Sequence, residues 1–131
     1  MGSFSNYLEN KILDHIFDKG DYTPPTIYVG LSTADPLDDA SGLAEPAGNG
    51  YARIQTPASD WTAASSGNIS NANELIFVEA TGDWGTVTHF AIFDAAIDGS
   101  MLCYGALTQA RTIVSGDKAR FAIADLSVSL D

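Results

Sequence analysis

The chain has 131 residues, enough to bury a hydrophobic core in one domain without a disulfide or a structural metal. Its composition, 45% hydrophobic and 18% charged, is that of a folded protein and excludes a disordered one. The formal net charge of −11 argues against binding to nucleic acid or to an anionic membrane, since both require cationic side chains, and no apolar stretch reaches the about 20 residues of a membrane helix.

The first predicted element is an amphipathic helix over residues 6–19. Ser5 or Asn6 is expected to cap its N-terminus, and Gly20 is expected to close its C-terminus. Apolar residues recur at the spacing of one helix face, at Leu8, Ile12 and Ile16. This stripe packs either on the domain itself or on a neighbouring subunit, and we name its three residues as candidate interface residues. We predict that deleting residues 1–19 leaves the sheet folded but abolishes assembly. The segment before the helix has neither a basic stretch nor an apolar core, so we expect no classical secretion.

A long loop is predicted at residues 33–50, after a half-buried strand at 26–32 that alternates between apolar and polar side chains. Loops of this length in small domains are often contact elements. Three of its carboxylates are therefore candidate interface residues: Asp35, Asp38 and Asp39. Clustered carboxylates could also hold Ca²⁺, but the alternation of an EF-hand loop is missing and prolines interrupt the spacing. We predict a solvated acidic loop and no metal.

The remaining strand signals are short and are separated by turn residues. Asp98-Gly99 predicts a hairpin, and Gly116-Asp117 predicts a turn between two further strands. The strands are expected at 51–56, 75–78, 86–94, 101–107, 112–114, 121–123 and 126–131.

This succession of short strands predicts a mainly β fold. The expected architecture is an antiparallel β-sandwich, jelly-roll-like, over residues 26–131, with the helix at 6–19 in front of it. A single closed barrel is the alternative architecture. No repeat and no linker divides the chain, so residues 1–131 are expected to form a single domain.

Enzymatic chemistry is not expected from the residues present. His15 lies on the polar face of the predicted helix and His89 lies in a strand, and neither belongs to a hydrolase or metalloprotease motif. The single cysteine, Cys103, sits in an apolar run and predicts a buried thiol rather than a nucleophile. We predict a non-enzymatic protein without a cofactor.

Two tryptophans, Trp61 and Trp84, leave a further alternative open. Aromatic rings can serve as stacking platforms for sugars, so a module that binds a host surface glycan is one interpretation. Each tryptophan, however, follows or precedes a turn residue. A tryptophan folded over the edge of a β core is at least as common a use.

Several segments, in order along nearly the whole chain, resemble a family of small phage virion proteins commonly labelled tail fibre proteins. The segments are SNYLEN (5–10), YTPPT (22–26), YVGLSTADP (28–36), GNGYAR (48–53), WGTVTHF (84–90), YGAL (104–107) and the terminal Leu130-Asp131. The polar stretch around residues 60–66 is longer than in that family and is expected to alter a surface loop.

The resemblance implies a non-enzymatic bacteriophage structural protein on the particle exterior. A compact chain fits a capsid decoration, cement or head-fibre subunit. A tail or baseplate fibre-associated protein is the alternative. The implied partners are other copies of the chain, for which a trimer is expected, and a major capsid or tail protein. The implied location is the virion, assembled in the host bacterial cytoplasm. The acidic surface agrees with an outward position, because packaged DNA would repel it.

Overall fold

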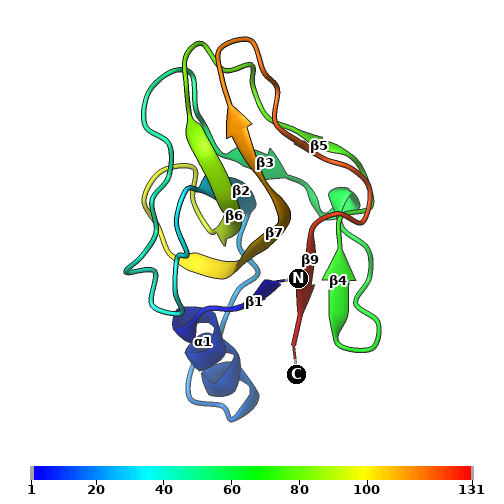
Figure 1. The fold of residues 1–131 in the computed structure, drawn as a ribbon. Coiled ribbons are helices and arrows are strands. Elements are labelled where there is room, and N and C mark those ends of the chain that lie inside the picture. Colours follow the sequence, from blue (N-terminus) through cyan, green and yellow to red (C-terminus); the bar gives the residue numbers. More distant parts are fainter. Residues whose placement is uncertain (1, 131) are drawn as a thin grey trace.

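A computed structural model describes residues 2–130, and within them one α-helix accompanies nine strands (Figure 1). The elements are β1 (Gly2–Phe4), α1 (Asn6–Ile16), β2 (Ile27–Ser32), β3 (Ile54–Thr56), a 3-10 turn (Ala58–Asp60), β4 (Asn68–Ser70), β5 (Leu75–Ile76), β6 (Gly85–Phe93), β7 (Met101–Ile113), β8 (Arg120–Phe121) and β9 (Ser127–Ser129). Seven strands form one sheet in the order β3-β2-β6-β7-β1-β9-β4, and β5 pairs with β8 in a small second sheet. The predicted mainly β class is confirmed.

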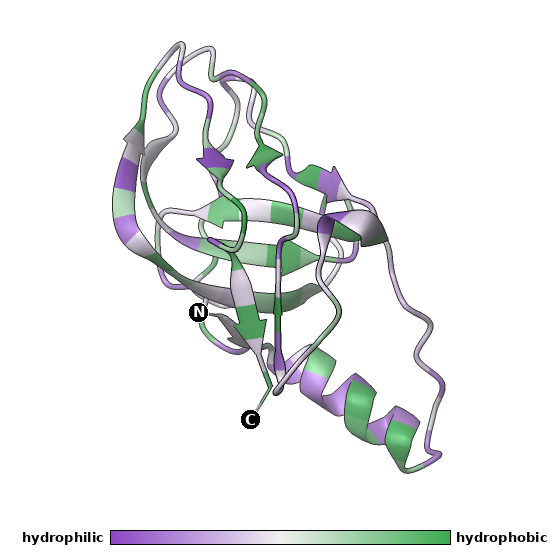
Figure 2. Ribbon diagram, turned by 90° about the vertical axis from the view of Figure 1, so that its right-hand side faces the viewer, coloured by the Kyte–Doolittle hydropathy of each residue, from purple (hydrophilic) through white to green (hydrophobic). Residues whose placement is uncertain are grey.

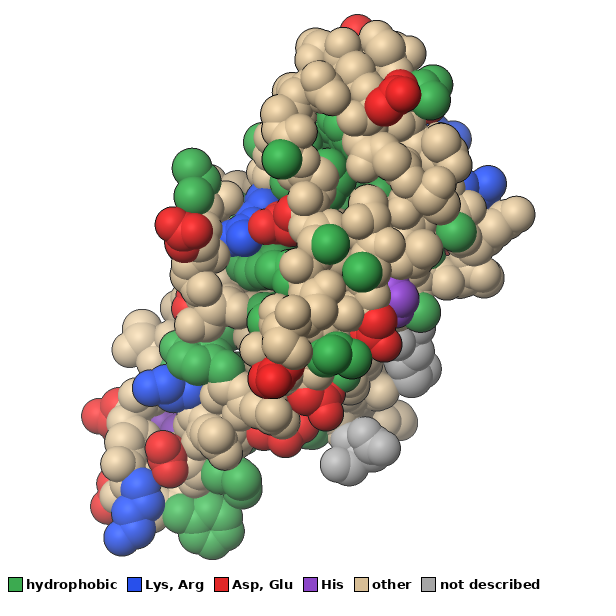
Figure 3. All heavy atoms as spheres, turned by 60° about the vertical axis from the view of Figure 1, so that its left-hand side comes forward, with side chains coloured by type: hydrophobic (Ala, Val, Ile, Leu, Met, Phe, Trp, Pro, Cys, Tyr) green, Lys and Arg blue, Asp and Glu red, His purple; other side chains and the backbone are tan. Residues whose placement is uncertain are grey.

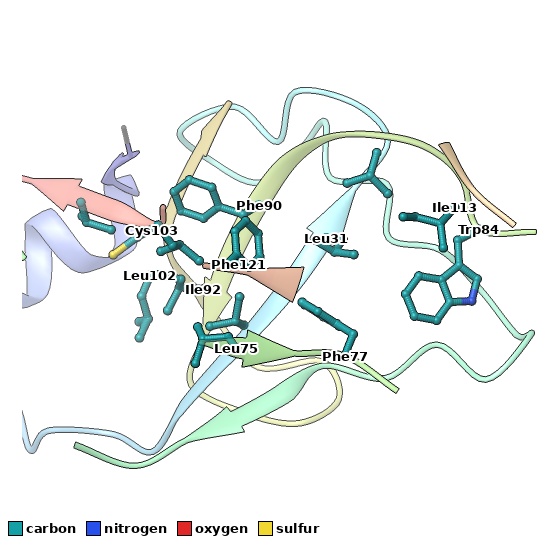
Figure 4. Packing of buried hydrophobic residues seen from close by; sticks show 14 of the residues in the cluster. Leu31, Leu75, Phe77, Trp84, Phe90, Ile92, Leu102, Cys103, Ile113 and Phe121 are labelled. Atoms are coloured by element: carbon teal, nitrogen blue, oxygen red, sulfur yellow. The ribbon is translucent and has the colours of Figure 1, made fainter. Parts of the chain in front are cut away.

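The long sheet curls, and the β5–β8 ribbon covers its inner face in a sandwich-like arrangement (Figures 1 and 2). The main core lies between these two layers and includes Leu31, Phe90 and Phe121, all less than a tenth exposed. Figure 4 shows Phe121 of β8 lying beside Phe90 of β6, and their ring centroids are 6.3 Å apart. Alternation along β6 accounts for this packing, because every second side chain of a strand points to the same face.

The outer face of the sheet is covered by segment 33–50. Ala91, Phe93 and Met101 are buried there, and Ala40 and Leu43 of the segment pack against them. The segment therefore forms part of the folded layer structure: residues 42–46 are half-buried, whereas 34–35, 37–39 and 47–50 are exposed. This cover places the acidic residues of the segment on the side of β6 and β7 that faces away from the main core.

β7 differs from the prediction because the predicted segments 101–107 and 112–114 fall, except for Val114, in one strand. Its pairing with β6 shifts between Val87, which is opposite Arg111, and His89, which is opposite Ala106, so β7 carries extra residues in a bulge. The polar residues of this bulge interrupt the apolar alternation, which is why the sequence suggested two strands. The predicted turn at 116–117 does form, but β8 pairs with β5 instead of with the end of β7.

Other differences concern the sheet edges. β1 and β4 were not predicted, and β1 pairs with β9 in parallel, through Gly2 and Val128, in an otherwise antiparallel sheet. The predicted strand at 51–56 is shorter, since only β3 is extended and paired. Asp131, the predicted end of the last strand, and Met1 lie outside the described residues.

α1 begins as predicted and ends earlier than predicted. The Ser5 side chain accepts a hydrogen bond from the backbone N–H of Leu8 and is the N-cap. The helix ends at Ile16 rather than at residue 19. The predicted closure by Gly20 is wrong, because Asp18 takes the left-handed conformation (φ 58°) and the Lys19 N–H bonds the Asp14 carbonyl in a Schellman motif. Within residues 2–130 no helix combines the length and apolarity needed to cross a membrane.

Candidate interaction surfaces

The apolar stripe of α1 is divided between the core and the surface. Leu8 is 7% exposed and belongs to the main core, whereas Ile12 is half-buried against it. Ile16, the third residue of the predicted stripe, is 69% exposed. The domain therefore covers the stripe fully at Leu8, partly at Ile12 and little at Ile16, and Figure 2 shows α1 projecting beyond the sheet.

The projecting end of α1 carries three exposed apolar side chains, Leu13, Ile16 and Phe17, which we call the helix-end patch. Leu130, which is also exposed, lines a hollow together with Leu13 between α1 and the end of β9. Leu13 and Phe17 are four residues apart, so their side chains lie on adjacent turns of one face. A contiguous apolar group of this kind on an acidic protein is typical of a contact surface.

The three predicted acidic interface residues lie in one turn, residues 35–41, which we call the acidic turn. Asp35 and Asp39 each accept a backbone hydrogen bond two residues further on, at 3.1 and 3.0 Å. All three carboxylates are exposed, and Leu37 between them is 47% exposed with a left-handed backbone (φ 64°). Figure 3 looks onto this side of the molecule and shows acidic side chains gathered near its centre.

The acidic turn is fixed to the sheet and to the helix. The Asp38 carbonyl accepts the Asn6 N–H at 2.9 Å, and the Asp38 carboxylate accepts the Tyr104 hydroxyl. That hydrogen bond raises the pKa of Tyr104, because an ionised phenol would lose it. Hydrogen bonds to Ser41 lower the pKa of Asp39. The structure thus brings the predicted carboxylates together next to the start of α1, while Ile16 lies at the other end of the helix.

One histidine of β6 lies beside the acidic turn. Asp35 has His89 as its neighbour, at 3.9 Å between Oδ1 and Nε2. Among residues 2–130, no three His, Cys, Asp or Glu side chains are grouped so that they could hold an ion.

Segment 33–50 is anchored at its second half by a polar network that the sequence did not predict. Arg53 donates to both carboxylate oxygens of Glu45, at 2.9 and 2.7 Å, and its guanidinium stacks on the Phe93 ring at 3.5 Å. The Tyr51 hydroxyl donates to Glu45 at 2.7 Å and accepts the Leu31 N–H at 3.0 Å. This N–H of β2 lies beyond the stretch that pairs with β3, so Tyr51 supplies its hydrogen-bond partner. Burial and the bond to Glu45 raise the pKa of Tyr51. These residues hold the loop that presents the acidic turn.

A second surface feature that the sequence did not reveal is a groove beside β7. Two adjoining hollows lie between the bulged half of β7 and residues 117–125, and the larger has a volume of about 510 Å³. Arg111, Lys118 and Arg120 line it, so half of the chain's six Lys and Arg residues meet there. These cations all lie within residues 111–120, but the return of the chain past β7 is what places them around one hollow.

The tryptophans are used within the fold. Trp84 is 4% exposed, donates to the Asn49 carbonyl at 2.9 Å and packs edge-on against Tyr51. Trp61 is half-buried and donates to the Thr56 hydroxyl at 2.9 Å. Trp84 therefore has no free ring face for a sugar, as the edge-of-core interpretation predicted.

The side chains with potential chemistry are also engaged. Burial raises the pKa of the Cys103 thiol to about 12, so it stays protonated at neutral pH. His89 Nδ1 is 2.8 Å from the Thr88 hydroxyl, and exposed His15 accepts the Tyr22 N–H at 3.3 Å.

A curled β-sheet with a projecting helix whose end is apolar defines a β-rich protein. The family model described as Podophage GP4 fiber I protein gp80 matches residues 3–129. The chain therefore belongs to this family and is a bacteriophage structural protein of the fibre type, a component of the virion. No curated protein matches it.

Proposed function

We propose that this protein is a non-enzymatic accessory subunit on the outside of the phage particle, attached through the helix-end patch. The observation that carries the proposal is the exposure of Ile16 and Phe17, at 69% and 68%, on a helix whose first turn is fixed to the sheet. A rigid helix that presents apolar side chains loses little conformational freedom on binding. The protein thus holds a preformed apolar end ready for a partner.

The partner is proposed to be a protein of the particle surface, with several copies of the chain arranged symmetrically around it. Accessory virion subunits act in repeated copies, and a closed ring such as a trimer is one such arrangement. The net charge of −11 supports an outward position away from packaged DNA.

Of the two locations, a fibre position receives support from the family's description as a podophage fibre protein. Capsid decoration is the second candidate, and the observation in its favour is that residues 2–130 form a compact layered unit rather than a shaft. Assembly in the host cytoplasm belongs to the same proposal. The burial of Trp84 weighs against a glycan-binding module.

The proposal is tested with the double variant Ile16→Asp/Phe17→Ser. Both side chains are exposed, so the variant is expected to fold like the wild type, with unchanged circular dichroism and a free energy of unfolding within about 1 kcal/mol. Attachment to purified particles that lack the protein is expected to fall at least tenfold, measured by co-sedimentation on capsids and, separately, on tails. Binding of the wild type to capsids alone or to tails alone shows which of the two carries the attachment site.

Ile97→Asp is the matched control, because Ile97 is 79% exposed on the turn between β6 and β7. It is expected to attach normally. Normal attachment of the helix variant would show that α1 is not the attachment element. We choose substitutions instead of the deletion of residues 1–19, because the deletion would remove β1, which pairs with both β7 and β9. The sheet is therefore not expected to stay folded after that deletion.

A further inference from the structure

The groove beside β7 is a preformed site with an apolar floor. β7 pairs with β1 as far as Gly105. Among the described residues, the part of β7 after Gly105 has β6 on one side and no strand on the other, and the groove opens on that unpaired side. The floor consists of inward-facing side chains of four strands, β2, β6, β7 and β8: Leu31, Val87, Ile113 and Phe121. Each of them is at most 8% exposed and belongs to the main core, so the floor is a part of that core.

The rim of the groove is cationic, in a protein that is otherwise strongly acidic. Arg111 and Lys118 have no carboxylate within salt-bridge distance among residues 2–130, and Arg120 has only exposed Glu74, at 3.6 Å. Two carboxylates also lie on the rim, Asp117 and Asp125, and they accept the backbone N–H groups of Val114 and Ala122. Among residues 2–130 neither is within salt-bridge distance of a rim cation, and the three cations outnumber them. The cations are therefore available for an acidic partner.

The acidic turn has the complementary arrangement. Leu37, an exposed apolar side chain, is surrounded by Asp35, Asp38 and Asp39, which matches an apolar floor surrounded by three cations. Segment 33–50 covers the outer face of β6 and β7, whereas the groove is lined by inner-face residues. The turn of one molecule cannot reach its own groove, so the contact joins two copies.

We infer that the acidic turn of one copy docks into the groove beside β7 of a second copy. Leu37 then lies on the apolar floor, and the carboxylates lie against Arg111, Lys118 and Arg120. This inference rests on the proposed function, in which the chain acts in several copies, and it names one contact between them. Because the two surfaces differ, the contact is head-to-tail, and repetition gives a ring or a filament according to the rotation per copy.

The test uses the full chain and measures molar mass against concentration by sedimentation. Arg111→Glu/Lys118→Glu disables the groove, and Leu37→Asp/Asp39→Lys disables the turn. Each is expected to weaken self-association at least about tenfold, because each exposed charge pair contributes a few-fold and reversal adds repulsion. Association of the wild type is expected to weaken as salt rises, since the charges lie on the rim. Lys19→Glu is the control for charge reversal outside the groove.

Mixing the two disabled variants gives the decisive outcome. The groove variant keeps its turn and the turn variant keeps its groove, so the mixture is expected to form a one-to-one dimer that grows no further. Wild-type-like association by the groove variant, or no dimer in the mixture, would overturn the inference. If Ile16→Asp/Phe17→Ser still associates with itself but no longer attaches to particles, the head-to-tail contact and the attachment by α1 are separate. A wild type that attaches but never self-associates retains the proposed attachment and overturns this contact.

Discussion

Arg53 shows how a single buried cation organises two loops. Its side chain is only 6% exposed and bonds the Ala95 and Asp98 carbonyls, both at 2.8 Å, in addition to Glu45. The guanidinium thus joins the segment after β2 to the turn between β6 and β7. Burial of a charge is costly unless its hydrogen-bonding groups have partners. Here the guanidinium N–H groups donate to four acceptor atoms.

Replacing Arg53 by Met is expected to lower the free energy of unfolding by about 3–5 kcal/mol, because Glu45 keeps its charge in a place that is only 20% exposed. Chemical denaturation measures the change. The double variant Glu45→Gln/Arg53→Met is expected to recover part of the loss, since no unpaired charge remains. Arg120→Met, which breaks an ion pair between exposed groups, is expected to cost at most about 1 kcal/mol. Equal losses for Arg53→Met and Arg120→Met would contradict this account.

Gly30 belongs to the same network for a steric reason. A Cβ at this position would lie 2.8 Å from the Tyr51 hydroxyl and 2.9 Å from Glu45 Oε1. Gly30→Ala is therefore expected to displace the Tyr51–Glu45 pair and to destabilise the protein by about 1–3 kcal/mol, as measured by denaturation. Gly20→Ala is the control, because its Cβ would meet no atom within 4 Å. A neutral Gly30→Ala would show that the network tolerates rearrangement.

At the scale of elements, the fold was predictable where local patterns coincide with tertiary packing. The helix and β2 have clear periods, and both are present. β1 and β4 were missed because their sequences, GSF and NIS, each contain a single large apolar residue and so show no alternation. The division of the α1 stripe, with Leu8 in the core and Ile16 exposed, depends on how far the sheet reaches. The groove beside β7 likewise depends on tertiary packing, because its cations surround the apolar floor only after β7 and β8 are placed.

The junction between β1 and α1 offers a test of coupling between the helix and the sheet. Ser5 is 2% exposed, donates to the Met101 carbonyl at 2.6 Å and caps Leu8. Ser5→Ala is expected to destabilise the protein by about 2–3 kcal/mol, since it removes the cap and leaves a buried carbonyl without its donor. Asn10→Ala, at an exposed position of the same helix, is expected to be neutral or stabilising. Denaturation followed by circular dichroism compares them, and a neutral Ser5→Ala would mean that α1 is held by other contacts.

For the whole molecule, the acidic balance and the placement of the titratable groups determine the response to pH. The Cys103 thiol and the phenols of Tyr22, Tyr51 and Tyr104 all have raised pKa values. Burial is the main cause for all but Tyr104, whose main cause is the bond to Asp38. Each group releases its proton more readily when the chain is unfolded. The folded state therefore binds more protons than the unfolded state in alkaline solution, and stability must fall as pH rises.

The expected profile is level near neutral pH and declines above pH 9, the ordinary pKa of a thiol. With the pKa of Cys103 at about 12, this group alone is expected to remove about 2 kcal/mol between pH 9 and pH 10.5. Denaturation at a series of pH values measures the decline, and Cys103→Ala is expected to make it shallower by that amount. Labelling at pH 8 provides an independent reading, because a protonated, 8% exposed thiol should react orders of magnitude more slowly than in the unfolded chain. Fast labelling of the folded protein, or stability that is unchanged up to pH 11, would show that Cys103 is not sealed in the main core.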